Sequence, residues 1–142
     1  MYKMLIQQID AKAAFIKLRD EKNAVLIDVR TDAEFAFTGT AEVANLILLP
    51  WKTFPTMGFN PRFTENLEKA LQEKFGDNKK DAELIFMCRS GARSSEAAIH
   101  MAQMGYTHCF NLIAGFEGDI DSAGHRGNIN GWKASNLAWR QS

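Results

Sequence analysis

Short apolar runs alternate with segments of helical periodicity along most of this chain. The runs cover residues 4–6, 25–29, 46–49, 84–87 and 110–113. This alternation is typical of β-α units laid into a parallel sheet, because a crossover between parallel strands leaves room for a helix. We therefore predict an α/β fold of three layers, in which a central, mostly parallel sheet of about five strands carries helices on both faces.

Three of the intervening segments have the spacing of amphipathic helices. In the first, apolar residues between 11 and 18 are spaced i, i+3, i+4 and i+7. The second is predicted over 61–75, with Asn60 as its capping residue and Gly76 at its end. The third is predicted to begin near residue 92 and to continue until residue 105.

The last part of the chain, 114–142, has a different character. Glycines recur through it without clear periodicity, yet it also carries tryptophan, phenylalanine and isoleucine residues. A disordered tail would be poor in such residues. We therefore predict a single domain over 1–142, in which 114–142 is a glycine-rich, loop-rich C-terminal flap packed on that domain.

The charge balance argues against a nucleic-acid partner. Lys and Arg number 17, as do Asp and Glu, so the net charge is 0 with neutral histidines, whereas a nucleic-acid-binding face is normally basic. No apolar run approaches the roughly 20 residues of a membrane helix, and the first 20 residues mix charges with apolar side chains, unlike a signal peptide. We expect no membrane partner and a cytoplasmic location, where both cysteines stay reduced.

A cysteine loop directly follows the fourth apolar run. It reads Cys88, Arg89, Ser90, Gly91, Ala92, Arg93 and Ser94. Between a parallel strand and a helix, this loop lies where open α/β sheets bind ligands, and the amides and dipole of the helix point back toward the sulfur. Gly91 allows the tight curvature that turns amides inward, and the two arginines add positive charge. Such surroundings favour a thiolate, so we expect Cys88 to be an ionised nucleophile at neutral pH.

Two chemistries suit a thiolate in an anion cradle. The sulfur could accept a sulfane sulfur and become a persulfide, or it could accept a phosphoryl group. Thiol phosphatases resemble the pattern Cys-x5-Arg, whereas Cys88 to Arg93 is Cys-x4-Arg. The shorter loop favours a single sulfur atom.

Three segments together resemble the rhodanese family. Residues 26–30, followed by Glu34-Phe35 and Gly39, are similar to its upstream signature. The cysteine loop is similar to its active loop, and 112–118 resembles its downstream signature, with Ala114-Gly115 where the family usually has a glycine pair. The resemblance implies a single-domain rhodanese-like fold and thiosulfate-like or persulfide sulfur donors.

Asp28, Arg30 and Glu34 are interpreted as a structural network that shapes the loops. A carboxylate that ends an apolar strand is costly to bury unpaired, so Asp28 should find a cation or backbone donors. Cys109 precedes an apolar strand and is interpreted as a core residue. The histidines lack the spacing of metal ligands, so we expect neither a metal nor another cofactor.

The expected function is that of a sulfurtransferase working in two half-reactions. The Cys88 thiolate takes the outer sulfur of thiosulfate or a similar anion, with Arg89 and Arg93 on the leaving group and the amides of Ser90–Ser94 around the persulfide. A thiol or a protein sulfur acceptor then removes the sulfur. Two alternatives stay open: a phosphatase or arsenate-reductase-like thiol enzyme, and a non-catalytic rhodanese-like module that binds a protein partner.

Overall fold

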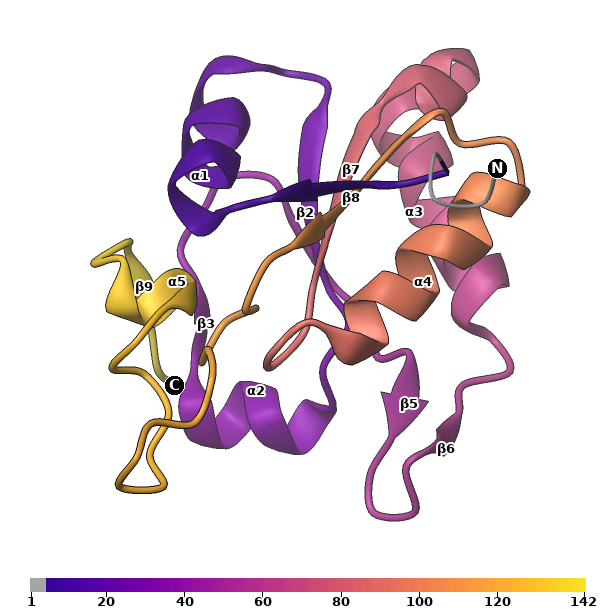
Figure 1. Cartoon of the computed structure of the whole chain (residues 1–142). Helices are drawn as coiled ribbons and strands as arrows, with labels where there is room; N and C mark the ends of the chain where they lie inside the picture. The colour runs from indigo at the N-terminus through magenta and orange to yellow at the C-terminus, as the bar shows by residue number, and fades with distance from the viewer. Residues whose placement is uncertain (1–4) are drawn as a thin grey trace.

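A parallel sheet forms the centre of the computed structural model, which describes residues 5–142 (Figure 1). Its five strands, in spatial order, are β1 (Gln7–Ile9), β8 (His108–Leu112), β7 (Glu83–Met87), β2 (Ala24–Asp28) and β4 (Leu46–Leu48). Every neighbouring pair is parallel. The predicted α/β class and its five-stranded sheet are therefore confirmed.

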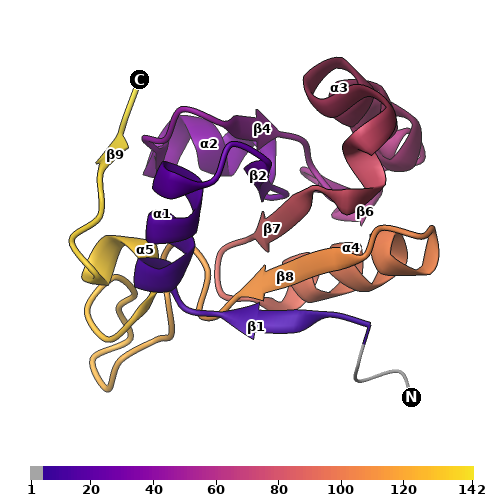
Figure 2. The same ribbon diagram turned by 90° about the horizontal axis from the view of Figure 1, so that it is seen from above.

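Helices cover both faces of this sheet. They are α1 (Ala11–Asp20), α2 (Asp32–Thr38), α3 (Phe63–Phe75), α4 (Ala92–Gln103) and α5 (Gly131–Ala134). Alternate strand residues point to opposite faces. Val25 and Ile27 therefore belong to the apolar layer that contains residues of α3 and α4, whereas Leu26 belongs to the layer that contains residues of α1 and α5. Figure 2 shows these two helix pairs on opposite sides of the strands.

The predicted strands agree with the structure within two residues, except for the first. β1 begins at Gln7, after the apolar run predicted over 4–6; residue 4 lies outside the described part of the chain. The predicted residues of this strand were wrong. β1 lies at the edge of the sheet and pairs only with β8, and both its glutamines are exposed, so the strand itself is not an apolar run. An edge strand need not be apolar, so its sequence carries no strong signal.

The predicted helix ends are mostly confirmed. α3 ends at Gly76, whose φ is +60°, a left-handed conformation that favours glycine. Its start was predicted two residues early. The Asn60 side-chain oxygen accepts the Arg62 amide at 3.1 Å and the Asn60 carbonyl accepts the Phe63 amide at 3.1 Å, so a separate turn precedes the helix. α4 begins at Ala92, as predicted, and ends two residues before Gly105.

The remaining chain forms two small antiparallel pairs and a short helix. β5 (Lys52–Thr53) pairs with β6 (Gly58–Phe59), β3 (Thr40–Ala41) pairs with β9 (Trp139–Arg140), and a 3-10 helix (Gly76–Asp81) follows α3. In the segment 114–142, Trp132 of α5 is fully buried in the layer below α1, and its indole Nε1 donates a hydrogen bond to the Ala138 carbonyl at 2.9 Å. Among residues 5–142, no helix is long and apolar enough to cross a membrane.

Candidate active site

Cys88 lies at the point where the strand order of the sheet reverses. From β2 the chain continues to β4 at one edge, whereas from β7 it continues to β8 on the other side. Open α/β sheets bind ligands at the carboxyl ends of the strands beside such a reversal. Asp28, the last residue of β2, pairs with Met87, the last residue of β7, so Asp28 and Cys88 lie at the carboxyl ends of two neighbouring parallel strands.

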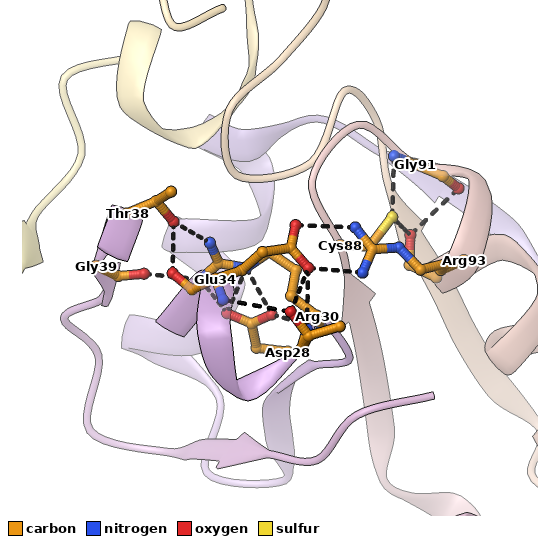
Figure 3. A network of polar contacts seen from close by, with 10 residues as sticks. Asp28, Arg30, Glu34, Thr38, Gly39, Cys88, Gly91 and Arg93 are labelled. Carbon is orange, nitrogen blue, oxygen red and sulfur yellow. Dashed lines mark hydrogen bonds and ion pairs between the residues drawn. The ribbon is translucent and has the colours of Figure 1, made fainter. Parts of the chain in front are cut away.

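The Cys88 sulfur is buried but surrounded by hydrogen-bond donors (Figure 3). The residue is 1% exposed. Its Sγ accepts a hydrogen bond from the Gly91 amide at 3.1 Å and lies 3.2 Å from the Ser94 hydroxyl. Gly91 precedes the first residue of α4 and has φ +120°, a conformation that L side chains rarely adopt. The backbone at the start of α4 therefore curls around the sulfur, and the helix dipole favours negative charge there.

The Ser94 hydroxyl has more acceptors within reach than it has protons. It lies 2.5 Å from the Asn111 Oδ1, 3.2 Å from the Gly91 carbonyl and 3.2 Å from the Cys88 Sγ. A hydroxyl carries one hydrogen, so only one of these atoms can be its principal acceptor at a time. Asn111 is held in turn, because its Nδ2 donates to the Gln8 Oε1 at 2.9 Å. Asn111 thereby connects Gln8 of the edge strand β1 to Ser94, whose hydroxyl lies beside the Cys88 sulfur.

The turn that follows β8 packs against the cysteine loop and donates hydrogen bonds to its backbone. The Phe116 amide donates to the Cys88 carbonyl at 2.8 Å, and the amides of Glu117 and Gly118 donate to the Arg89 carbonyl at 3.0 and 3.2 Å. Gly115 approaches so closely that a Cβ on it would meet the Cys88 carbonyl oxygen at 2.3 Å. The turn and the loop thus behave as one packed unit.

Asp28 and Arg30 form a buried ion pair beside this unit. The Arg30 Nη2 donates to the Asp28 Oδ2 at 2.7 Å, and both side chains are fully buried. Burial raises the pKa of Asp28, while the hydrogen bonds and charge of Arg30 act in the opposite sense. The Arg30 guanidinium also donates to the Gly39 carbonyl at 2.8 Å and lies 4.2 Å from the centre of the Phe116 ring. These two contacts of Arg30 therefore connect Gly39, at the end of α2, to Phe116 in the turn after β8.

Glu34 of α2 holds Arg93 of α4 by two hydrogen bonds, at 2.7 and 3.0 Å (Figure 3). The Glu34 Oε1 also accepts the Thr31 amide at 3.0 Å, which completes a capping box at the start of α2. Burial alone would raise the pKa of Glu34, but the hydrogen bonds from Arg93 and Thr31 and the charge of Arg93 outweigh it and lower this pKa to about 2. For Arg93, burial opposes the charge, yet the contacts with Glu34 raise the pKa.

Only some of the predicted site residues contact the Cys88 sulfur. Gly91 and Ser94 contact the Cys88 sulfur, whereas the Arg93 guanidinium is directed to Glu34. The Arg89 side chain is exposed, and within residues 5–142 no carboxylate lies within ion-pair distance of it. Ser90 is partly exposed and Ala92 is exposed, both at the surface of the loop.

Cys109 is separated chemically from this site. It is 2% exposed, and burial raises its pKa to about 12, so it is a neutral thiol at neutral pH. Its sulfur lies 3.6 Å from the Tyr106 carbonyl. Over residues 5–142 there is no group of three His, Cys, Asp or Glu side chains that could hold a metal ion.

A pocket beside the cysteine loop contains residues that the sequence did not indicate. It has a volume of about 360 Å³ and is lined by Thr31, Ala33, Glu34, Phe37, Thr38, Phe54, Met57, Arg89 and Arg93. α2 supplies one wall and the hairpin around β5 and β6 supplies another. The capping-box pattern of Thr31 and Glu34 is a sequence signal that could have located α2. No comparable signal marks Phe54 or Met57, which lie in the hairpin turn.

Comparison with known proteins identifies the family. The model of the rhodanese-like domain matches residues 11–120. This chain belongs to the rhodanese-like family. Among its relatives, the protein RP600 of Rickettsia prowazekii is 34% identical over 137 residues, which span 96% of this chain and 99% of that protein. A protein of Allochromatium vinosum named as a sulfurtransferase is 27% identical over 111 residues, 78% of this chain and 85% of that one.

One solved structure is similar to this chain over nearly its whole length. The crystal structure of Rv0390 from M. tuberculosis is 34% identical, with a TM-score of 0.83, over 96% of this chain and 98% of that one. The family match ends at residue 120, but these coverages extend beyond it. Most of the segment after residue 120 therefore has a counterpart in these two proteins, although it lies outside the family match.

Proposed function

We propose that this rhodanese-like protein is a sulfurtransferase in which Cys88 carries the transferred sulfur as a persulfide. The observation that carries the proposal is the set of donors around the Cys88 sulfur: the Gly91 amide and the Ser94 hydroxyl lie 3.1 and 3.2 Å away, at the N-terminus of α4. These donors stabilise negative charge on a thiolate, and they can do the same for a persulfide anion. The sulfurtransferase relative agrees with this assignment.

The reaction has two half-reactions, with thiosulfate as the proposed donor. In the first, the Cys88 thiolate attacks the outer sulfur of thiosulfate, a new S–S bond forms at Sγ, and the old S–S bond breaks so that sulfite leaves with its electron pair. In the second, a thiol or a protein sulfur acceptor attacks the outer sulfur of the persulfide, and the Cys88 thiolate is regenerated. Neither half-reaction needs a metal or an organic cofactor, and the scheme predicts ping-pong kinetics.

The two arginines act differently in this mechanism. Arg89 is exposed and has no carboxylate partner in the described chain, so it is available to the leaving sulfite. Arg93 is held by Glu34, so it contributes a fixed positive charge and keeps α2 against the start of α4. We therefore assign leaving-group contact to Arg89 and positioning to Arg93.

The test is mass spectrometry of the purified protein after incubation with thiosulfate. We expect a gain of one sulfur atom on Cys88, its loss on addition of cyanide, and its complete absence in the Cys88→Ser variant. The matched control is Cys109→Ser, since its hydroxyl retains a donor for the Tyr106 carbonyl and leaves Cys88 unchanged. A Cys88→Ser variant that still gains sulfur, or a wild type that never does so with any sulfane donor, would refute the proposal.

Activity assays on the same purified protein distinguish the alternative chemistries. Steady hydrolysis of an aryl phosphate, or thiol-dependent reduction of arsenate, would assign the protein to thiol-based phosphate or arsenate chemistry if it required Cys88. A protein that neither gains sulfur nor turns over these substrates would be a binding module. The six-residue span from Cys88 to Arg93 favours the sulfurtransferase.

A further inference from the structure

Asn111 is a polar side chain at a strand position where an apolar side chain is expected. β8 lies between β1 and β7, and Asn111 is only 6% exposed between the buried Phe110 and Leu112. Asparagine is depleted in strands, and burial of an amide costs free energy unless its atoms find hydrogen-bond partners. The Asn111 side chain finds them in Ser94 and Gln8. A buried amide that bonds to a residue beside the Cys88 sulfur points to a role at the site.

The contact with Gln8 fixes which end of the Asn111 amide faces Ser94. Gln8 lies opposite Asn111 in the pairing of β1 with β8, which Figure 2 shows side by side. The Gln8 Oε1 accepts a hydrogen bond from the Asn111 Nδ2 at 2.9 Å. With its nitrogen held in this way, Asn111 directs its Oδ1 at the Ser94 hydroxyl, 2.5 Å away. An amide oxygen only accepts hydrogen bonds, so Asn111 presents an acceptor to Ser94.

This acceptor competes with the Cys88 sulfur for one proton. The Ser94 hydroxyl lies 3.2 Å from the Cys88 Sγ and carries a single hydrogen. While that hydrogen is directed to Asn111, it cannot stabilise negative charge on Sγ. The other nearby acceptor is the Gly91 carbonyl, 3.2 Å from the Ser94 hydroxyl, which already accepts the Ser95 amide at 3.2 Å. Asn111 is therefore the main competitor of the sulfur.

We propose that Asn111 is a positioning residue that limits the stabilisation of the Cys88 thiolate by competing for the Ser94 proton. This inference rests on the ionised nucleophile of the proposed function. A thiolate that is stabilised more strongly forms at lower pH, but it is a weaker nucleophile. Asn111 thereby keeps the sulfur more reactive than it would be with the full hydrogen bond from Ser94.

The first test is Asn111→Leu, which replaces the amide by an apolar side chain and removes the competing acceptor. The Ser94 hydroxyl can then donate to Sγ, since a hydrogen bond to an anion is about twice as strong as one to a neutral carbonyl. The midpoint of Cys88 ionisation should move about one unit to lower pH, a tenfold change in the ionisation constant. It is followed by the ultraviolet absorbance of the thiolate against a Cys88→Ser blank. Cys109 does not interfere, because burial raises the pKa of this thiol to about 12.

The second measurement is the rate at which the fully ionised sulfur attacks hydroxyethyl disulfide, a small neutral reagent. Well above both midpoints, the Asn111→Leu protein should react about threefold more slowly, because nucleophilicity scales with roughly the 0.4–0.5 power of the change in ionisation constant. A merely structural role would not lower the midpoint and the rate together by these factors. The substitution leaves in place the charged groups on the elements around the loop, which are Arg89 in the loop, Arg93 on α4, Asp28 and Arg30 at the end of β2, Glu34 on α2 and Glu117 after β8.

The two glutamines of β1 supply a surface variant and its matched control. Gln8→Ala releases the Asn111 amide, which can turn its Nδ2 toward Ser94 so that the hydroxyl proton passes to Sγ. The ionisation constant of Cys88 should then rise about threefold. Gln7 is also exposed, but neighbouring residues of a strand point to opposite faces, so its side chain is directed away from Asn111. Gln7→Ala should leave the midpoint unchanged.

A Ser94→Ala background tests whether Asn111 acts through the hydroxyl. There the shared proton is absent, so Asn111→Leu should no longer move the midpoint. An equal shift in this background would overturn the inference, as would a midpoint that falls in neither Asn111→Leu nor Gln8→Ala. If Asn111→Leu does not fold, the comparison of Gln8→Ala with Gln7→Ala decides the question.

The outcomes separate this inference from the proposed function. A wild type that gains sulfur on Cys88, together with variants whose midpoints do not move, retains the sulfurtransferase and overturns the role of Asn111. A wild type that gains sulfur from no donor refutes the sulfurtransferase. In that case, midpoints that shift as expected still support the competition for the Ser94 proton.

Discussion

Gly115 offers a sharp test of how the cysteine loop is supported. It lies beside Ala114, and both residues have left-handed backbone conformations, with φ values of +62° and +67°. At Gly115 a Cβ would meet the Cys88 carbonyl oxygen at 2.3 Å and the Arg89 carbonyl carbon at 2.7 Å, distances that real Cβ atoms essentially never show. These neighbours are backbone atoms, so they cannot move aside as the end of a flexible side chain can.

The cost of Gly115→Ala has two parts. The left-handed conformation costs a residue with a Cβ about 1–2 kcal/mol. Relief of the overlap must separate the turn from the loop, which weakens the hydrogen bonds from the amides of 116, 117 and 118 to the Cys88 and Arg89 carbonyls. At about 1 kcal/mol for each bond, the free energy of unfolding should fall by about 4 kcal/mol in total. For a chain of 142 residues, at about 2.1 cal/mol/K for each residue, this lowers the Tm by about 13 °C.

The assay pairs thermal unfolding with the rate of Cys88 persulfide formation. Gly115→Ala should unfold at the lower Tm and, at a temperature where it is still folded, should form the persulfide at least tenfold more slowly, because its loop is displaced. Ala114→Gly is the matched control: it relieves the left-handed strain but adds entropy to the unfolded chain, so its stability should stay within about 1 kcal/mol of the wild type. If Gly115→Ala were as stable and as active as Ala114→Gly, the close contact between Gly115 and the backbone of the cysteine loop would not determine the stability or the position of that loop.

Two further predictions concern the groups that position the site. The pKa of Glu34 is lowered to about 2, so its pairing stabilises the fold above the ordinary carboxyl pKa near 4.5 and is lost as the pH falls from there toward about 2. Discounted for solvent screening, the pair contributes about 1–2 kcal/mol to the free energy of unfolding. Urea titrations should show that acid lowers the free energy of unfolding less in Glu34→Gln than in the wild type. If the two proteins lost the same free energy between pH 4.5 and pH 2, the stabilising role of the pair would be contradicted. Ser94→Ala removes a donor near Sγ and leaves the Asn111 Oδ1 without that hydroxyl, so alkylation of Cys88 by iodoacetamide at neutral pH should slow about tenfold while Cys109 stays unlabelled. Equal alkylation rates in Ser94→Ala and the wild type would exclude the hydroxyl as a partner of the thiolate.

Local patterns predicted much of the framework. The apolar runs indicated β2, β4, β7 and β8, because buried parallel strands need continuous apolar residues. Gly76 marked the end of α3, and the glycine-containing cysteine loop located the start of α4. The resemblance to the rhodanese family on three short segments led to the family that the comparison identifies.

The missed elements share a physical cause. α2 contains no buried residue, so it has no apolar stripe to reveal it, and its capping box was its only strong local signal. The exposed glutamines of β1 likewise hide an edge strand that is held by its backbone pairing with β8. Both elements are fixed by groups far away in the sequence.

The order of apolar and polar residues along the chain was enough to predict most of the sheet, most of its helices and the position of the cysteine loop before α4, because each of these depends on neighbours within a few positions. Which way Arg93 points, how Ser94 shares its proton with Asn111, and where α2 and the hairpin enclose a pocket were decided only by the folded chain. The ion pair between Glu34 and Arg93 joins residues 59 positions apart. A long side chain selects among rotamers of similar energy according to the partners within its reach, and only folding brings those partners there.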